Sequence, residues 1–147
     1  MAVSSTRDVV DVLLSQHEQI KEALAKVPIL SGPHKAAAFD RLRALLHAHE
    51  TAEQEIVHPA TRDYAGEGDI AGHRVAEEVG AEAMLARLTD LGSDHADFDA
   101  EFMKLHDAVL QHAEREEVEE FPQLRKVLAP DLLVSLAERL RAAEMKA

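Results

Sequence analysis

Two stretches of the sequence, HETAEQEIVHP (residues 49–59) and HAEREEVEEFP (residues 112–122), share one pattern. Each begins with His-x-x-x-Glu, at His49–Glu53 and at His112–Glu116, and each has a proline six residues after that Glu. Matched positions are 63 residues apart, as 49 and 112 or 53 and 116 show. Residues four apart on a helix lie about one turn from each other on the same face. Each stretch therefore predicts a helix that presents an imidazole beside a carboxylate, a pair suited to holding a metal ion.

The composition is typical of an all-α protein of one domain, spanning residues 1–147. Ala, Leu, Glu and Arg, which favour helices, dominate the 147 residues, and aromatic residues make up only 3%. A chain of this length can bury about 70% of its unfolded surface, so a core of Leu, Val, Ala and a few Phe is expected. The absence of Cys excludes disulfides and thiolate metal sites.

The charge of the chain bears on its partners and location. Asp and Glu outnumber Lys and Arg by 28 to 16, for a net charge of −12. Such a charge argues against nucleic acid or an anionic membrane as the main partner. The N-terminus lacks a basic-then-apolar signal pattern, and no apolar run approaches the roughly 18 residues of a membrane span. We therefore expect a soluble, cytoplasmic protein.

The spacing of apolar residues predicts four long helices and a shorter fifth. They are expected at about 8–27, 34–64, 70–91, 95–128 and 131–145. Ser5 and Asp8 fit a capping box at the first helix, and Asp94 is expected to cap the fourth. Pro59 and Pro122 should kink the second and fourth helices. Short connections favour an up-down-up-down four-helix bundle over residues 8–128, with the last helix packed along or across it.

Six ionisable residues fall on the inward stripes of these helices. They are His17, His49, Glu53, Glu78, His112 and Glu116. Burying such groups unpaired would cost several kcal/mol each, and the inward stripes carry no Lys or Arg to pair with them. A bound cation explains the pattern, and a set of imidazoles and carboxylates suits iron or manganese, with zinc as a further option.

The remaining histidines are interpreted mostly as surface residues. His47 should face away from His49, and His34, His95 and the His73–Glu77 pair are expected at the surface. His106 should flank the stripe. His58, which matches Phe121 in the repeat, is likewise interpreted as a residue without a role in the site. The alternative for His58 is a place beside the ligands or on an entry path.

At the two repeated stretches the chain resembles the hemerythrin-like family, which carries the HHE cation-binding domain. The resemblance covers about residues 8–128 and implies a four-helix bundle that holds two non-haem iron ions (Fe²⁺ or Fe³⁺). An oxo, hydroxo or water bridge between the ions is possible in such a site. It further implies that Glu53 and Glu116 bridge the ions, while His17, His49 and His112 are terminal ligands. The ferritin-like diiron proteins are rejected, because they use Glu-x-x-His twice and this chain has only Glu55–His58.

The third helix departs from the family pattern, which has a Glu-His pair there. Here the stretch reads AEEVGAEA, residues 76–83. The stripe favours Glu78 for the ligand position, whereas a shift of one residue would place Val79 there, and Glu82 could also reach. In each case the imidazole of this helix is missing, which puts reversible oxygen binding in doubt.

Three classes of function are compatible with the sequence. The first is a diiron protein that binds or senses a small molecule such as oxygen, nitric oxide or iron itself. The second is a diiron enzyme that decomposes hydrogen peroxide, as catalases do. The third is a metal-free helical interaction module. The inward His and Glu residues favour the first two, and the first is preferred.

Overall fold

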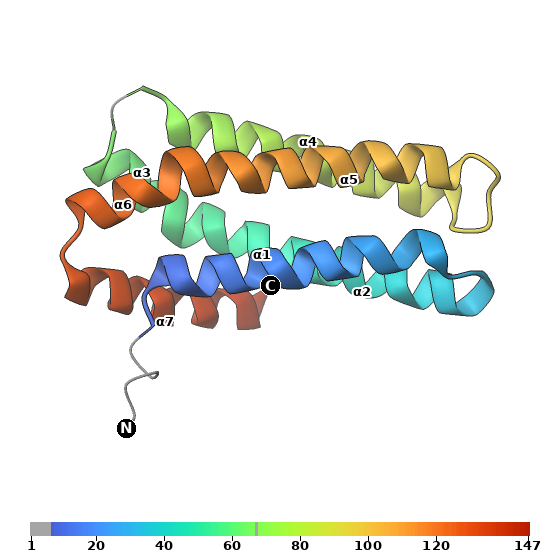
Figure 1. Ribbon diagram of the computed structural model, residues 1–147, viewed down its shortest axis with the longest axis horizontal. Helices are drawn as coiled ribbons and strands as arrows, with labels where there is room; N and C mark the ends of the chain where they lie inside the picture. Colours follow the sequence, from blue (N-terminus) through green and yellow to red (C-terminus); the bar gives the residue numbers. More distant parts are fainter. Residues whose placement is uncertain (1–6, 67) are drawn as a thin grey trace.

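The computed structural model describes residues 7–66 and 68–147, which form helices and connecting turns (Figure 1). The elements are α1 (Val9–Lys26), a 3-10 turn η2 (Val27–Ile29), α2 (Gly32–Ala52), a π-turn η3 (Glu53–Val57), α3 (His58–Tyr64), α4 (Ile70–Leu91), α5 (Phe98–Arg115), a π-turn η4 (Glu116–Glu120), α6 (Phe121–Val127) and α7 (Pro130–Lys146). The units α1, α2–η3–α3, α4 and α5–η4–α6 run alternately in opposite directions along the bundle. The predicted all-α, up-down-up-down four-helix bundle is confirmed.

The start of α1 is held by a capping box, but not by the predicted one. Asp8 accepts a hydrogen bond from the backbone N–H of Asp11 (2.8 Å), and the Asp11 side chain accepts one from the N–H of Asp8 (3.2 Å). Ser5, the partner expected from the sequence, lies outside the described residues. Arg125 of α6 forms ion pairs with both aspartates, at 2.9 and 2.8 Å. The capping residues of α1 are therefore also linked to α6 through Arg125.

The repeated prolines act through two π-turns. The N–H of His58 bonds to the carbonyl of Glu53, and the N–H of Phe121 bonds to the carbonyl of Glu116, each five residues back. Because proline has no N–H, the α-helical pattern cannot continue through it, and one wide turn before each proline absorbs the defect. Consequently, residues after Glu53 and Glu116 face directions that an uninterrupted α-helix would not give them.

The connection before α5 differs from the expectation. The helix begins at Phe98 rather than near His95, and its N-cap residue is Asp97, which makes no side-chain capping bond. The predicted cap at Asp94 is therefore wrong. Gly92, with φ of 88°, ends α4 in a conformation that favours glycine, and residues 93–97 form turns. The connection between α4 and α5 is therefore longer than the capping pattern indicated.

The apolar core is divided into two clusters. One joins the beginning of α1 to η3, α6 and α7, with Leu13, Phe121, Leu124 and Leu140 among its buried residues. The other joins the far halves of α1, α2, α4 and α5 around three aromatic residues, Phe39, Phe98 and Phe102. The six inward His and Glu residues lie between these clusters along each of the four helices. Apolar packing on both sides thus encloses a polar layer.

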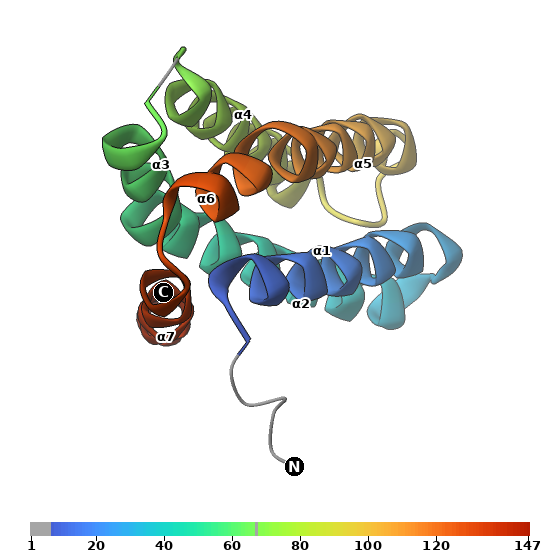
Figure 2. The ribbon, with the colours of Figure 1, turned by 60° about the vertical axis from the view of Figure 1, so that its left-hand side comes forward.

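The last helix, α7, packs beside α1 and α2, on the side of the bundle away from α4 and α5 (Figure 2). Its residues Leu133, Leu136 and Leu140 are buried against the bundle. It also packs against η3, in which Glu53 and Val57 are buried while Gln54 and Glu55 stay exposed. None of the described helices is long and apolar enough to cross a membrane.

Candidate metal centre

The structure brings all six predicted site residues together in the polar layer. Each of the four bundle helices contributes, and the three carboxylates of Glu53, Glu78 and Glu116 are completely buried. The imidazoles of His17, His49 and His112 are also buried, with 3, 4 and 7% of each residue exposed. Their role as metal ligands stays a prediction, but their convergence is a feature of the fold.

Four of these residues form a first group of donors. The Nε2 atom of His17 lies 3.0 Å from Oε1 of Glu116, and Nε2 of His49 lies 3.2 Å from Oε1 of Glu53. One ligand atom from each of the four residues lies within 4.8 Å of the others. This group therefore joins α1, α2 and the two π-turns around one small volume.

A second group lies on the other side of the two shared carboxylates. The Nε2 atom of His112 is 3.0 Å from Oε2 of Glu78 and 3.2 Å from Oε2 of Glu116. Glu53 completes the group, again with ligand atoms within 4.8 Å of one another. Glu53 and Glu116 belong to both groups, which is the position that bridging carboxylates would occupy.

An acceptor outside the cluster holds each of these imidazoles. The Nδ1 atom of His17 lies 2.6 Å from Glu117, that of His49 lies 2.7 Å from Gln16, and that of His112 lies 2.7 Å from Glu77. A proton on Nδ1 satisfies each contact and leaves Nε2 to face the cluster. Histidines that bind metals are commonly oriented in this way. Gln16, Glu77 and Glu117 were not predicted for this role.

Several buried oxygens of the cluster lack a hydrogen bond among the described residues. They include both carboxylate oxygens of Glu53 and Oε2 of Glu116. Imidazole nitrogens lie near them, at 3.2 Å, but not in a direction that makes a hydrogen bond. Two donors about 2.1 Å from one ion and at right angles to each other would lie about 3.0 Å apart. The observed spacing and the unpaired oxygens therefore fit residues that point at a common cation.

The protonation of the cluster shows how strongly its members interact. Burial lowers the pKa of His49 to about 4. Burial also opposes charge on His112, but Glu116 and Glu78 outweigh it and raise the pKa of His112 to about 11. Burial and the neighbouring Glu116 raise the pKa of Glu53 well above its usual range. Because metals bind imidazole and carboxylate in their deprotonated forms, a bound cation would take the place of these protons.

A small interior gap of about 10 Å³ adjoins the first group. Its lining is mostly apolar and includes Ile20, Leu46, Val109 and Ala113, together with His49 and Glu50. Such a volume accommodates roughly one water-sized molecule. Burial raises the pKa of Glu50 to about 9, with the charge of Glu78 adding to this, and Oε1 of Glu50 has no hydrogen-bond partner among the described residues. Glu50 was not predicted from the sequence.

The register of the third helix is clear in the structure. Glu78 is fully buried, Val79 is 59% exposed, and Glu82 pairs with the exposed His47 at 3.2 Å. The helix therefore has the register in which Glu78, and not Val79 or Glu82, faces the interior. Glu78 accepts a hydrogen bond from Gln54 (3.0 Å) besides its contact with His112.

Glu77 and Arg74 differ from their sequence-based assignments. Glu77, expected at the surface, is half-buried and contacts Nδ1 of His112. Arg74 is buried although the inward stripes were thought to lack basic residues, but its guanidinium pairs with Glu77 and Glu119 rather than with the six. The expected surface positions are confirmed for His34, His47, His73 and His95, and His106 is partly buried.

His58 is the main residue that the sequence analysis assigned elsewhere. It is completely buried beside the second group, with Nε2 2.9 Å from Oε2 of Glu78 and 3.7 Å from Oε2 of Glu116. Its Nδ1 atom lies 2.8 Å from Oε2 of Glu120, which is itself fully buried. His58, Glu116 and Glu120 form a third group of possible metal donors. The proline that follows His58 was the available signal, because it marks the π-turn.

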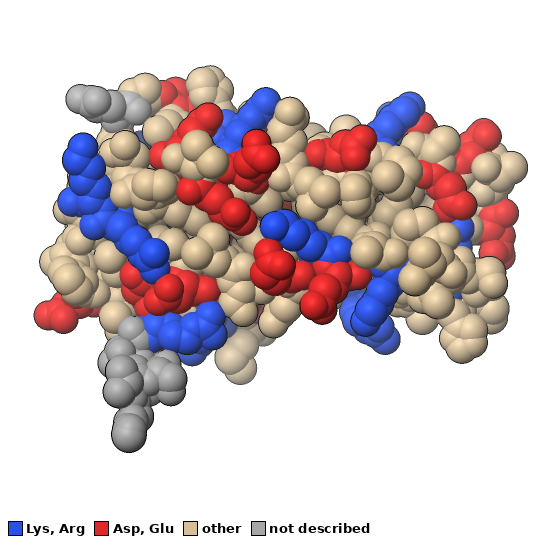
Figure 3. Space-filling view, viewed as in Figure 1, with Lys and Arg blue, Asp and Glu red and all other residues tan. Residues whose placement is uncertain are grey.

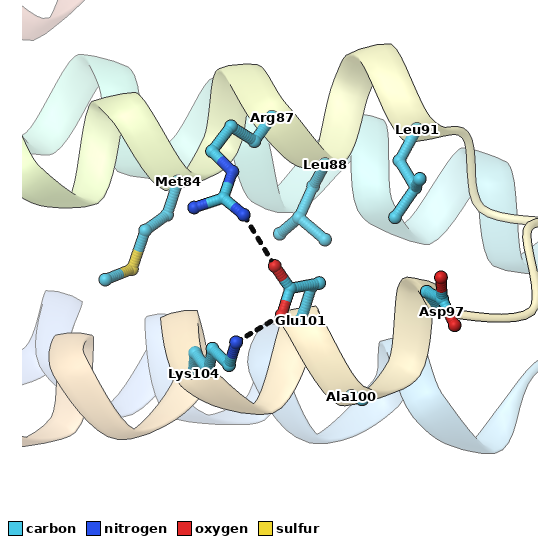
Figure 4. A pocket seen from close by; sticks show the side chains of 8 residues that line it. All are labelled: Met84, Arg87, Leu88, Leu91, Asp97, Ala100, Glu101 and Lys104. Atoms are coloured by element: carbon cyan, nitrogen blue, oxygen red, sulfur yellow. Dashed lines mark hydrogen bonds and ion pairs between the residues drawn. The ribbon is translucent and has the colours of Figure 1, made fainter.

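A larger, exposed hollow lies between α4 and the start of α5, away from the cluster (Figure 4). Its volume is about 350 Å³, and Glu101 bridges Arg87 and Lys104 across it. None of the six site residues lines this hollow. The polar layer and its small gap are therefore the better candidate for function.

Known proteins similar to this chain include a family of cation-binding domains. The hemerythrin HHE cation binding domain matches residues 6–124. A protein named DNA nickase, from Nostoc sp. (strain PCC 7120 / SAG 25.82 / UTEX 2576), is 25% identical over 137 residues, which cover 92% of this chain and 39% of that relative. The chain thus spans well under half of the relative's length, and no solved structure is significantly similar to it. On the family match and the buried His and Glu clusters, the chain belongs to the hemerythrin HHE cation-binding family.

Proposed function

We propose that the protein holds two non-haem iron ions and binds or senses a small molecule such as oxygen, nitric oxide or iron itself. The observation that carries this proposal is the pair of donor groups that share Glu53 and Glu116. Two ions on either side of shared carboxylates would each receive imidazole and carboxylate ligands, a set that suits iron. When bound, the iron ions would supply redox chemistry and a coordination position for a diatomic ligand.

The gap beside the first group supports a small ligand. At about 10 Å³ it has room for something near the size of water, and its apolar lining favours a neutral diatomic over a charged metabolite. The partner class proposed for the chain is therefore a diatomic molecule or peroxide.

The test begins with elemental analysis of protein purified from iron-replete cells. The expected result is about two iron ions per chain, as two donor groups imply. The anaerobically reduced protein is then titrated with oxygen and with nitric oxide while its optical spectrum is recorded. Protein without any transition metal would contradict the proposal and favour a helical interaction module.

Decomposition of hydrogen peroxide is the second candidate, and Glu50 is the observation that favours it. Glu50 lines the gap, and Oε1 of its buried carboxyl has no hydrogen-bond partner among the described residues, so this oxygen is available to carry a proton. The reaction converts two molecules of peroxide into two of water and one of oxygen, so it needs no external reductant. Rapid oxygen release from peroxide, reduced in Glu50→Gln, would favour the enzyme over the sensor.

The DNA-nicking activity in the relative's name is not part of this proposal. A net charge of −12 would repel the phosphate backbone, and the matched region is 39% of that relative. On the face shown in Figure 3, basic side chains are interspersed with acidic ones. We propose that this chain acts without nucleic acid or membrane as a partner, in the cytoplasm.

A further inference from the structure

The geometry points to His58 as a metal ligand of the second donor group, where it supplies the imidazole that the third helix lacks. This inference rests on the proposed metal centre and names one more residue in it. His58 does not begin a His-x-x-x-Glu motif, and it is not one of the six residues predicted as ligands.

The first support is the orientation of the ring. Like His17, His49 and His112, His58 has Nδ1 against a side-chain acceptor and Nε2 toward the shared carboxylates. Its acceptor, Glu120, is fixed in turn by a hydrogen bond from Thr61. Buried carboxylates that orient a histidine in this way are typical of metal sites. His58 thus has the same surroundings as the three histidines already predicted to be ligands.

The second support is the position of Nε2. It lies 2.9 Å from Oε2 of Glu78, and the same oxygen lies 3.0 Å from Nε2 of His112. Both values match the roughly 3.0 Å expected for neighbouring ligands at right angles on one ion. With Nδ1 protonated, an unprotonated Nε2 would face a carboxylate oxygen, so either a proton or a metal ion must lie between them.

The third support comes from the internal repeat. In the first half of the chain His17 is the helix imidazole, and it stacks on Phe121 with ring centroids 5.6 Å apart. In the second half Glu78 occupies the helix position, and His58 occupies the position that matches Phe121. His58 thus lies beside Glu78 as Phe121 lies beside His17, and with His58 as a ligand each donor group would have two imidazoles. They are His17 with His49, and His58 with His112.

Other polar features of the molecule lack these properties. The exposed hollow between α4 and α5 has a lining that is paired within itself, through Glu101. Glu50 lines a gap of the site already described. Among the described residues outside the six, only His58 combines full burial, a fixed ring and a spacing that matches a ligand.

The experiment compares wild-type protein with His58→Gln and His47→Gln, loaded anaerobically with ⁵⁷Fe²⁺. Glutamine retains a hydrogen-bond donor near Glu78 but is a poor iron ligand, so it separates ligation from positioning. Chelator competition measures the affinity for each ion, and Mössbauer spectra report the surroundings of each. His47 is exposed and pairs only with Glu82 among the described residues, so His47→Gln should behave as wild type.

If His58 is a ligand, His58→Gln lowers the affinity for one of the two ions. The loss exceeds the roughly 10–100-fold that is typical of removing a residue that only positions a ligand. The Mössbauer doublet of that ion changes while the other is retained. Two ions held with wild-type affinity and spectrum, or a loss within the positioning range, would overturn the inference alone. Wild-type protein that takes up no iron would overturn the metal centre and the inference with it.

A measurement on the unmutated protein covers the case in which His58→Gln does not fold. Protein labelled with ¹⁵N-histidine is loaded with Zn²⁺, and long-range ¹H–¹⁵N spectra assign the state of each ring nitrogen. The Nε2 of His58 should show the shift of a metal-bound nitrogen, as should those of His17, His49 and His112. A protonated Nε2 at His58, with the other three metal-bound, would refute the inference.

Discussion

The Nε2 atom of His112 lies 3.0 Å from Oε2 of Glu78, which joins α5 to α4 across the interior of the bundle. This contact gives the third helix a function in the polar layer although it lacks a histidine there. It also excludes Val79, which is exposed, from the same position.

Glu78→Ala should reduce the iron content from about two ions per chain to about one, because the second group loses a terminal carboxylate. Elemental analysis after desalting measures the change. Val79→Ala, one residue away on the exposed face, is the matched control and should keep both ions. Glu78→His should restore the family's usual ligand type and shift the protein toward reversible oxygen binding. If Val79→His produced that shift instead, the assigned register would be incorrect.

Glu53→Ala and Glu116→Ala should each impair both metal positions, because each carboxylate belongs to both donor groups. The iron content should fall below about one ion per chain, and the remaining spectrum should differ from that of Glu78→Ala. His47→Ala provides the control, since its side chain is exposed. Loss of a single ion from either Glu variant would show that the carboxylate is terminal rather than bridging.

Glu77→Gln should weaken the binding of the ion nearest His112 by roughly 10–100-fold, the usual effect of removing an outer partner of a ligating histidine. Glu77 contacts Nδ1 of His112 at 2.7 Å and is held by Arg74 and Arg115. Chelator competition measures the affinity. Glu119→Gln removes an acid that also pairs with Arg74 but has no histidine contact among the described residues, so it should bind as wild type. Equal losses in the two variants would point to a general charge effect.

Removal of the metal should lower the melting temperature, because an ion that joins four helices stabilises only the folded state. Ligand at a hundredfold excess over its Kd stabilises by about 2.7 kcal/mol, and each kcal/mol moves Tm by about 2–4 °C for a chain of this size. A decrease of at least about 5 °C is therefore expected on chelation, measured by circular dichroism. An unchanged melt after verified removal would make the ions peripheral to stability.

The metal-free protein should lose stability as the pH rises from about 7 to 10. The pKa of His112 is raised to about 11 and that of His58 to about 10, by carboxylates that outweigh the effect of burial. A raised pKa in the folded state contributes stability that is complete below the unfolded value of about 6.5 and is lost as pH rises through the folded value. Burial raises the pKa of Glu50 to about 9, which acts in the same direction. Urea denaturation at pH 7, 8.5 and 10 measures the slope, and a rising free energy of unfolding would contradict the expectation.

The number of helices, their inward faces and the six clustered residues were determined by the sequence itself. These features follow from a local period of 3.6 residues, which places His17, Leu13 and Leu24 on one face without knowledge of the fold. The doublets His49–Glu53 and His112–Glu116 obey the same rule, because each ends at the first residue of its π-turn, before the wide turn alters the phase.

The structure, rather than the helical period, decided the positions of His58 and of the outer acceptors. In an uninterrupted α-helix His58 would lie about 140° from Glu53, facing away from the cluster. The π-turn bonds residues five apart, so His58 lies one turn above Glu53 and faces inward. The contacts of His58 with Glu120 and of His112 with Glu77 join residues on different helices. No helical period relates such residues, and only the packing of the bundle brings them together.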